Sequence, residues 1–294
     1  MNRKRFLTSL ALLPFATTAM KLNDFSKLSQ SMERTDLMPV LFVGHGSPMN
    51  AIETNEFTEG WRVTAASMPK PNAILCISAH WETNGTFVTS MPKPITVHDF
   101  GGFPQKLFDV QYPAPGSPEL ARETRELITD TKVALDEQWG LDHGAWSVIK
   151  QMYPDASVPV IQLSLDYRKS AKSQYNLAKD LAPLRRKGVL IIGSGNMVHN
   201  LRKLDWSGKT AGFDWALEAN ETFKKLISGN EHQKLTDYQK LGTAAGMAIP
   251  SPEHYLPLLY VLALKNKGEN TTFFNDKMVM GSISMTSVVV SGGV

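Results

Sequence analysis

Three apolar segments of this sequence each end close to a histidine. The segments are residues 40–43, 73–79 and 189–192, and the histidines that follow them are His45, His80 and His199. In open α/β sheets, ligands bind just beyond the carboxyl ends of the strands. Imidazole is a common protein ligand of zinc and iron, and it exchanges protons near neutral pH. We therefore expect these side chains to meet at one sheet edge in a metal or catalytic site.

A fourth histidine, His254, follows Ser251-Pro-Glu, and a Ser-Pro pair is typical of the start of a helix. Taken singly, each histidine is more simply interpreted as a hydrogen-bonded structural residue. Three or four converging imidazoles would instead form a metal centre with an open coordination position, which is the catalytic arrangement. His232 lies in a polar helical stretch and is predicted to be solvent-exposed.

Two other motifs can be excluded around Ser194. A serine nucleophile elbow needs glycines two positions on either side of the serine, where this chain has Ile192 and Asn196. A dinucleotide fingerprint needs a third glycine where Val198 stands. The sequence also lacks a P-loop and a His-Glu-x-x-His motif. A serine hydrolase or a nucleotide-dependent enzyme is therefore a poor interpretation.

Apolar strands alternate with helical segments along the chain. We expect strands at residues 39–43, 72–78, 86–90, 158–163, 188–192, 271–280 and 282–290, and helices at 53–67, 117–131, 170–184, 213–227 and from Ser251 onward. Near-continuous apolar strands indicate burial on both faces, as in a parallel sheet. The sequence predicts one three-layer α/β domain over residues 38–294, with a central mostly parallel, mixed sheet flanked by helices. The Pro-, Gly- and aromatic-rich segment 92–118 is expected to be a loop that faces the substrate.

Composition excludes several classes of partner. The 294-residue chain has a formal net charge of +3 and no long basic run, so nothing indicates binding to nucleic acid. Its single cysteine, Cys76, lies in an apolar strand and is interpreted as a core residue. No feature of the sequence specifies an oligomeric state.

The first residues have the pattern of an export signal. A basic segment at residues 3–5, an apolar stretch at 6–16 and small residues at 17–19 are typical of a secretory or twin-arginine-like peptide, too short for a stable membrane anchor. We predict a signal peptide over residues 1–19, a linker over 20–37 and a periplasmic location. The alternative is an amphipathic tail that stays on a cytoplasmic protein.

The chain from about Met38 to the C-terminus resembles the class III extradiol ring-cleaving dioxygenases, specifically their 4,5-DOPA dioxygenase extradiol branch. The motifs that carry the resemblance are Gly-His45-Gly-Ser-Pro, Ser-Ala-His80-Trp, Asp-Phe-Gly-Gly-Phe-Pro104, His143-Gly-Ala-Trp, Gly-Ser-Gly-Asn-Met-Val-His199-Asn and Pro-Glu-His254-Tyr-Leu-Pro. Their number and order make coincidence a poor explanation.

The resemblance implies a role for each of these histidines. It implies His45, His80 and His254 as ligands of one divalent metal ion, Zn(II) or Fe(II), and His199 as acid–base catalyst or fourth ligand. It implies His143 as a second polar catalytic group in the pocket. Protocatechuate-type members of the superfamily complete a two-His-one-carboxylate iron site with a glutamate. Here His254 takes that position, with Glu253 beside it.

The expected reaction is extradiol opening of a catechol such as DOPA by dioxygen, which gives a muconic semialdehyde-type product. Two alternatives remain at this stage. One is a zinc hydrolase that uses metal-bound hydroxide, with His199 as general base. The other is a non-enzymatic protein that binds metal or catechol.

Overall fold

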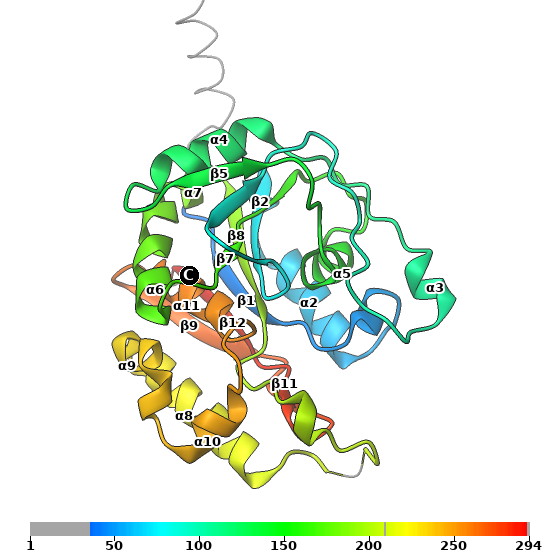
Figure 1. The fold of residues 1–294 in the computed structure, drawn as a ribbon, viewed down its shortest axis with the longest axis vertical. Helices are drawn as coiled ribbons and strands as arrows, with labels where there is room; N and C mark the ends of the chain where they lie inside the picture. Colours follow the sequence, from blue (N-terminus) through cyan, green and yellow to red (C-terminus); the bar gives the residue numbers. More distant parts are fainter. Residues whose placement is uncertain (1–35, 209, 293–294) are drawn as a thin grey trace, which may run out of the picture.

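A six-stranded sheet forms the centre of the computed structural model, which describes residues 36–208 and 210–292 (Figure 1). In spatial order its strands are β6 (Val160–Gln162), β2 (Ala73–Ser78), β8 (Val189–Gly195), β1 (Val40–Gly44), β12 (Ser287–Gly292) and β9 (Glu269–Phe274). The first four strands run parallel, whereas β12 pairs antiparallel with both β1 and β9. This confirms the prediction of a mostly parallel, mixed sheet in an α/β fold.

Helices cover both faces of the sheet. Alternate residues of β1 enter different cores: Val40 and Phe42 face one side, while Leu41 and Val43 face the other. The first side is covered by α4 (Pro118–Leu127), α6 (Ala171–Ala178), α8 (Asp214–Ser228) and α11 (Leu256–Ala263). The second is covered by α2 (Glu56–Ala66) and α5 (His143–Met152) (Figure 1). Burial on both faces explains why the strands are almost uniformly apolar.

Short elements fill the connections. Three two-stranded ladders pair β3 (Glu82–Thr83) with β7 (Leu165–Asp166), β4 (Thr86–Thr89) with β5 (Val133–Asp136), and β10 (Met278–Val279) with β11 (Ile283–Ser284). The remaining short helices are η1 (Pro48–Ala51), α3 (Gln105–Phe108), η2 (Lys179–Leu181), α7 (Ala182–Arg185), η3 (Leu201–Lys203), α9 (His232–Thr236), η4 (Tyr238–Lys240) and α10 (Thr243–Ala248). The segment predicted as a loop at 92–118 is irregular apart from α3.

Helix starts follow local capping chemistry where a side chain can reach the free amides. The Ser117 hydroxyl accepts a hydrogen bond from the Leu120 amide, so the predicted start of α4 is confirmed. The second Ser-Pro pair behaves differently. Ser251 donates its hydroxyl hydrogen to Glu253, and the helix begins only at Leu256. The prediction that a helix starts at Ser251 was therefore wrong, and His254 lies in a turn before the helix.

The prediction that His232 is solvent-exposed was also wrong. Its side chain lies where α9 packs against α6 and α11, and the residue is only 8% exposed. Its Nδ1 atom lies 3.4 Å from the Tyr175 hydroxyl. The polar residues around it in the sequence face solvent, but a five-residue helix still buries one side against its neighbours.

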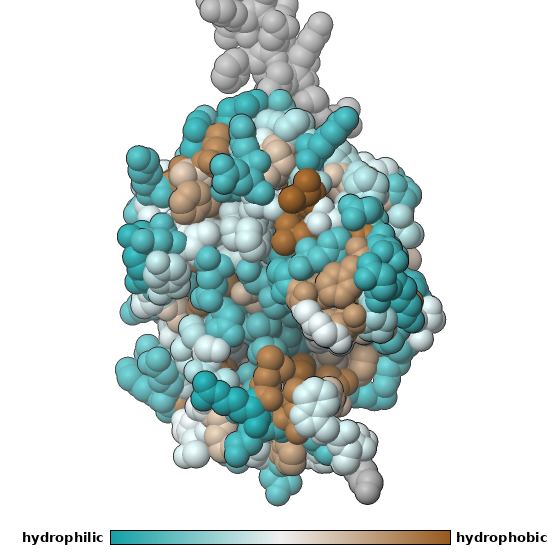
Figure 2. All heavy atoms as spheres, turned by 45° about the vertical axis from the view of Figure 1, so that its right-hand side comes forward, coloured by the Kyte–Doolittle hydropathy of each residue, from teal (hydrophilic) through white to brown (hydrophobic). Residues whose placement is uncertain are grey.

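The surface is mostly hydrophilic, and the face in Figure 2 shows apolar atoms in separate groups. Within residues 36–208 and 210–292, no helix has both the length and the apolar character needed to cross a bilayer. The predicted export peptide at residues 1–19, and the predicted linker up to residue 35, lie outside the described residues, so both stay predictions.

Candidate metal centre and active site

The carboxyl ends of β1, β2 and β8 meet at one edge of the sheet, and this edge collects the histidines. His45 directly follows β1 and donates its amide to the Gly195 carbonyl at the end of β8. His80 lies two residues beyond the end of β2. His254 comes from the turn before α11, and its carbonyl accepts the Asn196 amide at 2.8 Å. The predicted convergence of strand ends is therefore present in the fold.

Close backbone approach brings His254 to this edge. A Cβ atom at Gly195 would lie 2.1 Å from the His254 carbonyl oxygen, so only glycine allows the turn to pack against β8. A Cβ atom at Gly144 would likewise lie 2.5 Å from the Ser78 hydroxyl and 2.9 Å from the His80 ring. Both glycines belong to motifs singled out in the sequence.

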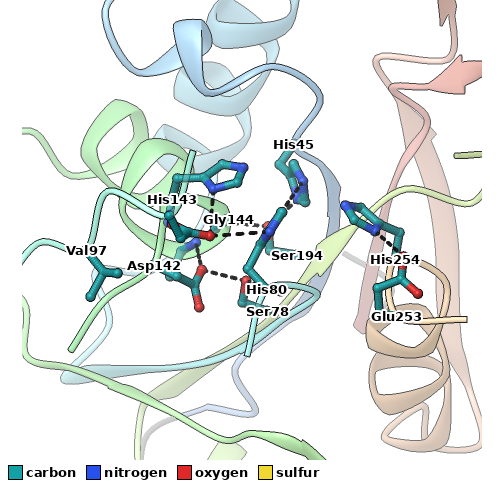
Figure 3. Close-up of polar contacts among 12 residues, drawn as sticks. His45, Ser78, His80, Val97, Asp142, His143, Gly144, Ser194, Glu253 and His254 are labelled. Atoms are coloured by element: carbon teal, nitrogen blue, oxygen red, sulfur yellow. Dashed lines mark hydrogen bonds and ion pairs between the residues drawn. The ribbon is translucent and has the colours of Figure 1, made fainter. Parts of the chain in front are cut away.

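The rings of His45, His80 and His254 face one another (Figure 3). Each offers a nitrogen, and the three nitrogens lie within 4.8 Å of one another. The ring of His254 lies 5.3 Å from that of His45 and 5.0 Å from that of His80, measured between centroids. These are the three residues that the resemblance implies as metal ligands, and their arrangement could hold a metal ion.

Each ring of the triad has an oxygen near its Nδ1 atom, through a hydrogen bond for His45 and His254 and a charge contact for His80. His45 Nδ1 lies 3.1 Å from the Ser194 hydroxyl, which itself donates to the Gly144 carbonyl and so accepts from the imidazole. His254 Nδ1 lies 3.1 Å from Glu253 Oε1. His80 Nδ1 lies 3.4 Å from Asp99 Oδ2. Ligand histidines in proteins typically donate their second nitrogen in this way, which leaves the Nε2 lone pair for the metal.

This donor set fits a divalent metal ion. The Nε2 atoms of His45 and His80 lie 3.2 Å apart, and with Nδ1 protonated both carry lone pairs. Two facing lone pairs repel unless a cation lies between them. In a tetrahedral site with Zn–N bonds of about 2.0–2.1 Å, two ligand nitrogens are roughly 3.3 Å apart. The nitrogens of His45 and His80 have this spacing, and the nitrogen of His254 lies within 4.8 Å of both, so the three can serve as ligands of one ion.

His143 lies beside the triad, at the start of α5. Its ring centroid is 3.8 Å from that of His80. Asp142 caps α5 by accepting the Ala145 amide, and it also accepts the Ser78 hydroxyl at 2.6 Å, which ties the helix to the end of β2. Asp99 accepts both the amide and the Nδ1–H of His143, at 2.8 and 2.9 Å. The Nε2 atom of His143 is thus left free for a ligand.

His199 stacks on the triad without joining it. Its ring is nearly parallel to that of His254, with an interplanar angle of 11° and centroids 3.5 Å apart. One of its nitrogens groups instead with a carboxylate oxygen of Glu253 and a nitrogen of His254. The His199 amide donates to the Ala248 carbonyl, which fixes the backbone at this position.

Burial lowers the pKa of four of the imidazoles, those of His45, His80, His199 and His254, and so keeps them neutral. Burial lowers the pKa of His80 to about 3 and that of His199 to about 4, with neighbouring carboxylates opposing the effect. Burial, and then the neighbouring histidines, lowers the pKa of His45 and of His254 well below the usual value. Neutral imidazole is the form that binds a metal or accepts a proton.

One carboxylate among these imidazoles stays ionised. Burial alone would raise the pKa of Asp99, but its hydrogen bonds and attraction to His143 hold that pKa below the usual value. The side chain of Asp99 is 17% exposed, so it lies at the edge of the histidine cluster and not in its interior.

An aromatic cluster borders the cluster of histidines. The ring of Phe100 is edge-on to that of His143, with centroids 5.6 Å apart, and it also packs on Phe103, Phe108 and Trp146. Most of these rings come from the segment 92–118 that was expected to face the substrate. They place an apolar wall next to the polar groups of the site.

Three residues that contact the histidine rings were not assigned a role from the sequence: Asp99, Ser194 and Glu253. Only Glu253 is also a sequence neighbour of the histidine that it contacts. Asp142, next to His143, acts by capping α5. Ser194 was considered only as a nucleophile, whereas it orients His45.

Residues 39–291 match the family described as the catalytic LigB subunit of aromatic ring-opening dioxygenase. The chain belongs to this family. It is therefore an aromatic ring-opening dioxygenase, and the family's dependence on a metal agrees with the histidine triad. Membership decides against the zinc hydrolase and the non-enzymatic binding protein as primary functions.

Two curated relatives and one solved structure support this family. The 4,5-DOPA dioxygenase extradiol of Escherichia coli K12 is 47% identical over 259 residues, which cover 86% of this chain and 94% of that protein. The 4,5-DOPA dioxygenase extradiol of Beta vulgaris is 37% identical over 243 residues, covering 80% and 89%. The crystal structure of an uncharacterized protein from Escherichia coli K12 has a TM-score of 0.77 at 42% identity, covering 86% of this chain and 100% of that one.

Proposed function

We propose that this dioxygenase opens the ring of a small catechol, DOPA or a close relative, beside the two hydroxyl groups and with dioxygen as co-substrate. The product would be a muconic semialdehyde. The observation that carries the proposal is the triad of His45, His80 and His254, whose nitrogens lie within 4.8 Å of one another beside two further imidazoles. The names of the two curated relatives support DOPA as the first substrate to test.

His45, His80 and His254 would hold the metal through Nε2. A bound Fe(II) supplies redox chemistry and Lewis acidity, whereas Zn(II) supplies Lewis acidity alone. Three neutral ligands leave the full charge of the ion uncompensated, and this favours an anionic ligand on the open side. A catechol that has lost a proton meets that requirement.

His199 would take the proton that the catechol loses. Burial lowers its pKa, so the ring is in the neutral form that can accept a proton, and its stacking on His254 keeps it next to a ligand position. We therefore assign His199 as acid–base catalyst in preference to fourth ligand.

His143, which packs on His80 whereas His199 stacks on His254, would also contact the substrate. Its Nδ1 atom is already bonded to Asp99, so the available atom is Nε2, which is a hydrogen-bond acceptor when the ring is neutral. The remaining hydroxyl group of the catechol is a suitable donor to this nitrogen. Phe100 beside His143 would pack against the aromatic ring of the substrate and keep water away from it.

Anaerobic reconstitution of metal-free protein with Fe(II), in parallel with Zn(II), tests the proposal. DOPA and air are then added while oxygen uptake and the yellow absorbance of the semialdehyde are recorded. Oxygen uptake matched by product with iron alone is the expected result. If iron binds but no catechol in a panel causes oxygen uptake, the proposed substrate class is wrong.

A further inference from the structure

One carboxylate oxygen contacts two of the histidines at once. Asp99 Oδ2 lies 2.9 Å from His143 Nδ1 and 3.4 Å from His80 Nδ1, while Asp99 Oδ1 accepts the His143 amide at 2.8 Å. The two rings are in contact, with centroids 3.8 Å apart. By contrast, Ser194 and Glu253 each hold a single ring, that of His45 and that of His254.

We propose that Asp99 is a positioning residue that sets the tautomer of the metal ligand His80 and of the substrate-facing His143 together. The assignment of these two histidines rests on the proposed function. Asp99 itself touches neither metal nor substrate in this scheme and acts only through the two rings.

The chemistry of the carboxylate leads to this assignment. An ionised carboxylate only accepts hydrogen bonds, so its bond to His143 places hydrogen on that Nδ1 atom. Its negative charge, 3.4 Å from His80 Nδ1, favours hydrogen on the same nitrogen of His80. Both Nε2 atoms then present lone pairs, one toward the ligand triad and the other toward the substrate side. A tautomer with hydrogen on Nε2 of His80 would place a proton where the metal must bind, and the charge of Asp99 beside Nδ1 disfavours it.

An amide at position 99 cannot do the same. The oxygen of an asparagine could face the His143 amide or the pair of Nδ1 atoms, but not both. With its oxygen on the amide, the NH₂ group would donate toward both rings and favour hydrogen on Nε2. Asp99→Asn should therefore disturb the site more than Asp99→Ala, which removes the acceptor without adding a donor.

The position of Asp99 in the chain links this role to the aromatic wall. Asp99 lies between His98 and Phe100, in the segment that carries the wall. A contact of 3.0 Å between His98 Nε2 and the Val110 carbonyl joins the two ends of this part of the segment. Phe100 packs edge-on against His143. The segment that contacts the substrate would thus also orient a metal ligand.

The test compares Asp99→Asn and Asp99→Ala with two control variants. Glu253→Gln alters the partner of one ligand only, and Asp109→Asn alters an exposed carboxylate of the same segment that bonds Gln105. The first readout is Zn(II) affinity, measured by competition with a chromophoric chelator. The second is the long-range ¹H–¹⁵N spectrum of the imidazoles in the zinc-loaded protein, which reports the nitrogen that carries hydrogen.

We expect Asp99→Asn to weaken Zn(II) binding about 10–100-fold, the usual effect of losing such a partner, and to shift the signals of both His80 and His143. Asp99→Ala should weaken it less. Glu253→Gln should weaken Zn(II) binding without moving the His143 signals, and Asp109→Asn should change neither readout.

Three results would overturn the proposal. The first is unchanged Zn(II) affinity and unchanged imidazole spectra in Asp99→Asn. The second is a spectral shift confined to one of the two rings. The third is a larger loss of Zn(II) affinity in Asp99→Ala than in Asp99→Asn, which would mean that Asp99 acts through packing and not through its hydrogen bonds. None of these readouts requires turnover. An absence of oxygen uptake by the iron-loaded parent protein would therefore count against the proposed function and leave the role of Asp99 separately measurable.

Discussion

The Nε2 atom of His45 lies 3.2 Å from the Nε2 atom of His80, and both rings are held from behind through Nδ1. In the metal-free protein one ring can donate this contact through Nε2–H to the other. With hydrogen on both Nδ1 atoms the two lone pairs face each other, and a bound cation relieves their repulsion. The first prediction follows from this pair.

Removing one ring of the triad should abolish tight metal binding. His45→Ala leaves two imidazoles of the three, and metal-to-protein stoichiometry after dialysis should fall from one to near zero, as measured by elemental analysis. His232→Asn is the control, because His232 is buried under α6 and α11 away from the triad. Full stoichiometry in His45→Ala would show that the metal is held elsewhere.

The metal-free protein should lose stability as the pH falls from about 7 toward 4. The folded pKa of His80 is about 3 and that of His199 about 4, against an ordinary value of 6.5, so the unfolded chain binds more protons in this window. Each such proton changes the free energy of unfolding by about 1.4 kcal/mol per pH unit. Urea unfolding at several pH values measures the slope, and His199→Gln should reduce it. A flat profile between pH 5 and 7 would contradict the neutral cluster.

His199→Gln should separate catalysis from metal binding. If His199 exchanges protons with the substrate, kcat/KM falls by about 10²–10⁴-fold while the metal stoichiometry is retained. Oxygen uptake and elemental analysis on the same sample measure both quantities. Loss of the metal in this variant would instead identify His199 as a fourth ligand.

Gly195→Ala should damage the site through the backbone. The added Cβ would lie 2.1 Å from the His254 carbonyl oxygen, so the turn that carries His254 must move. We expect a loss of about 1–3 kcal/mol in the free energy of unfolding and weaker metal binding. Gly246→Ala, in α10 with open space around it, is the matched control and should be neutral or slightly stabilising. Equal effects of the two substitutions would argue against close packing at Gly195.

Local patterns predicted the parts of the fold that depend on neighbouring residues. The apolar runs that became β1, β2 and β8 place His45 and His80 at one sheet edge because parallel strands end on the same side. The Ser117 cap was also read correctly. His232 and Ser251 were not, since the burial of a short helix and the choice of a capping partner depend on elements far away in the chain.

The sequence by itself determined the class of fold and the set of histidines, and its motifs led to metal chemistry as a hypothesis. Only the tertiary structure decided which oxygen holds each ring: Ser194 reaches His45 across 149 residues, and Asp99 reaches His143 across 44. Strand and helix patterns are local, because they reflect the periodicity of the backbone. Hydrogen-bond partners are set by the packing of whole elements, and no short stretch of sequence contains that information.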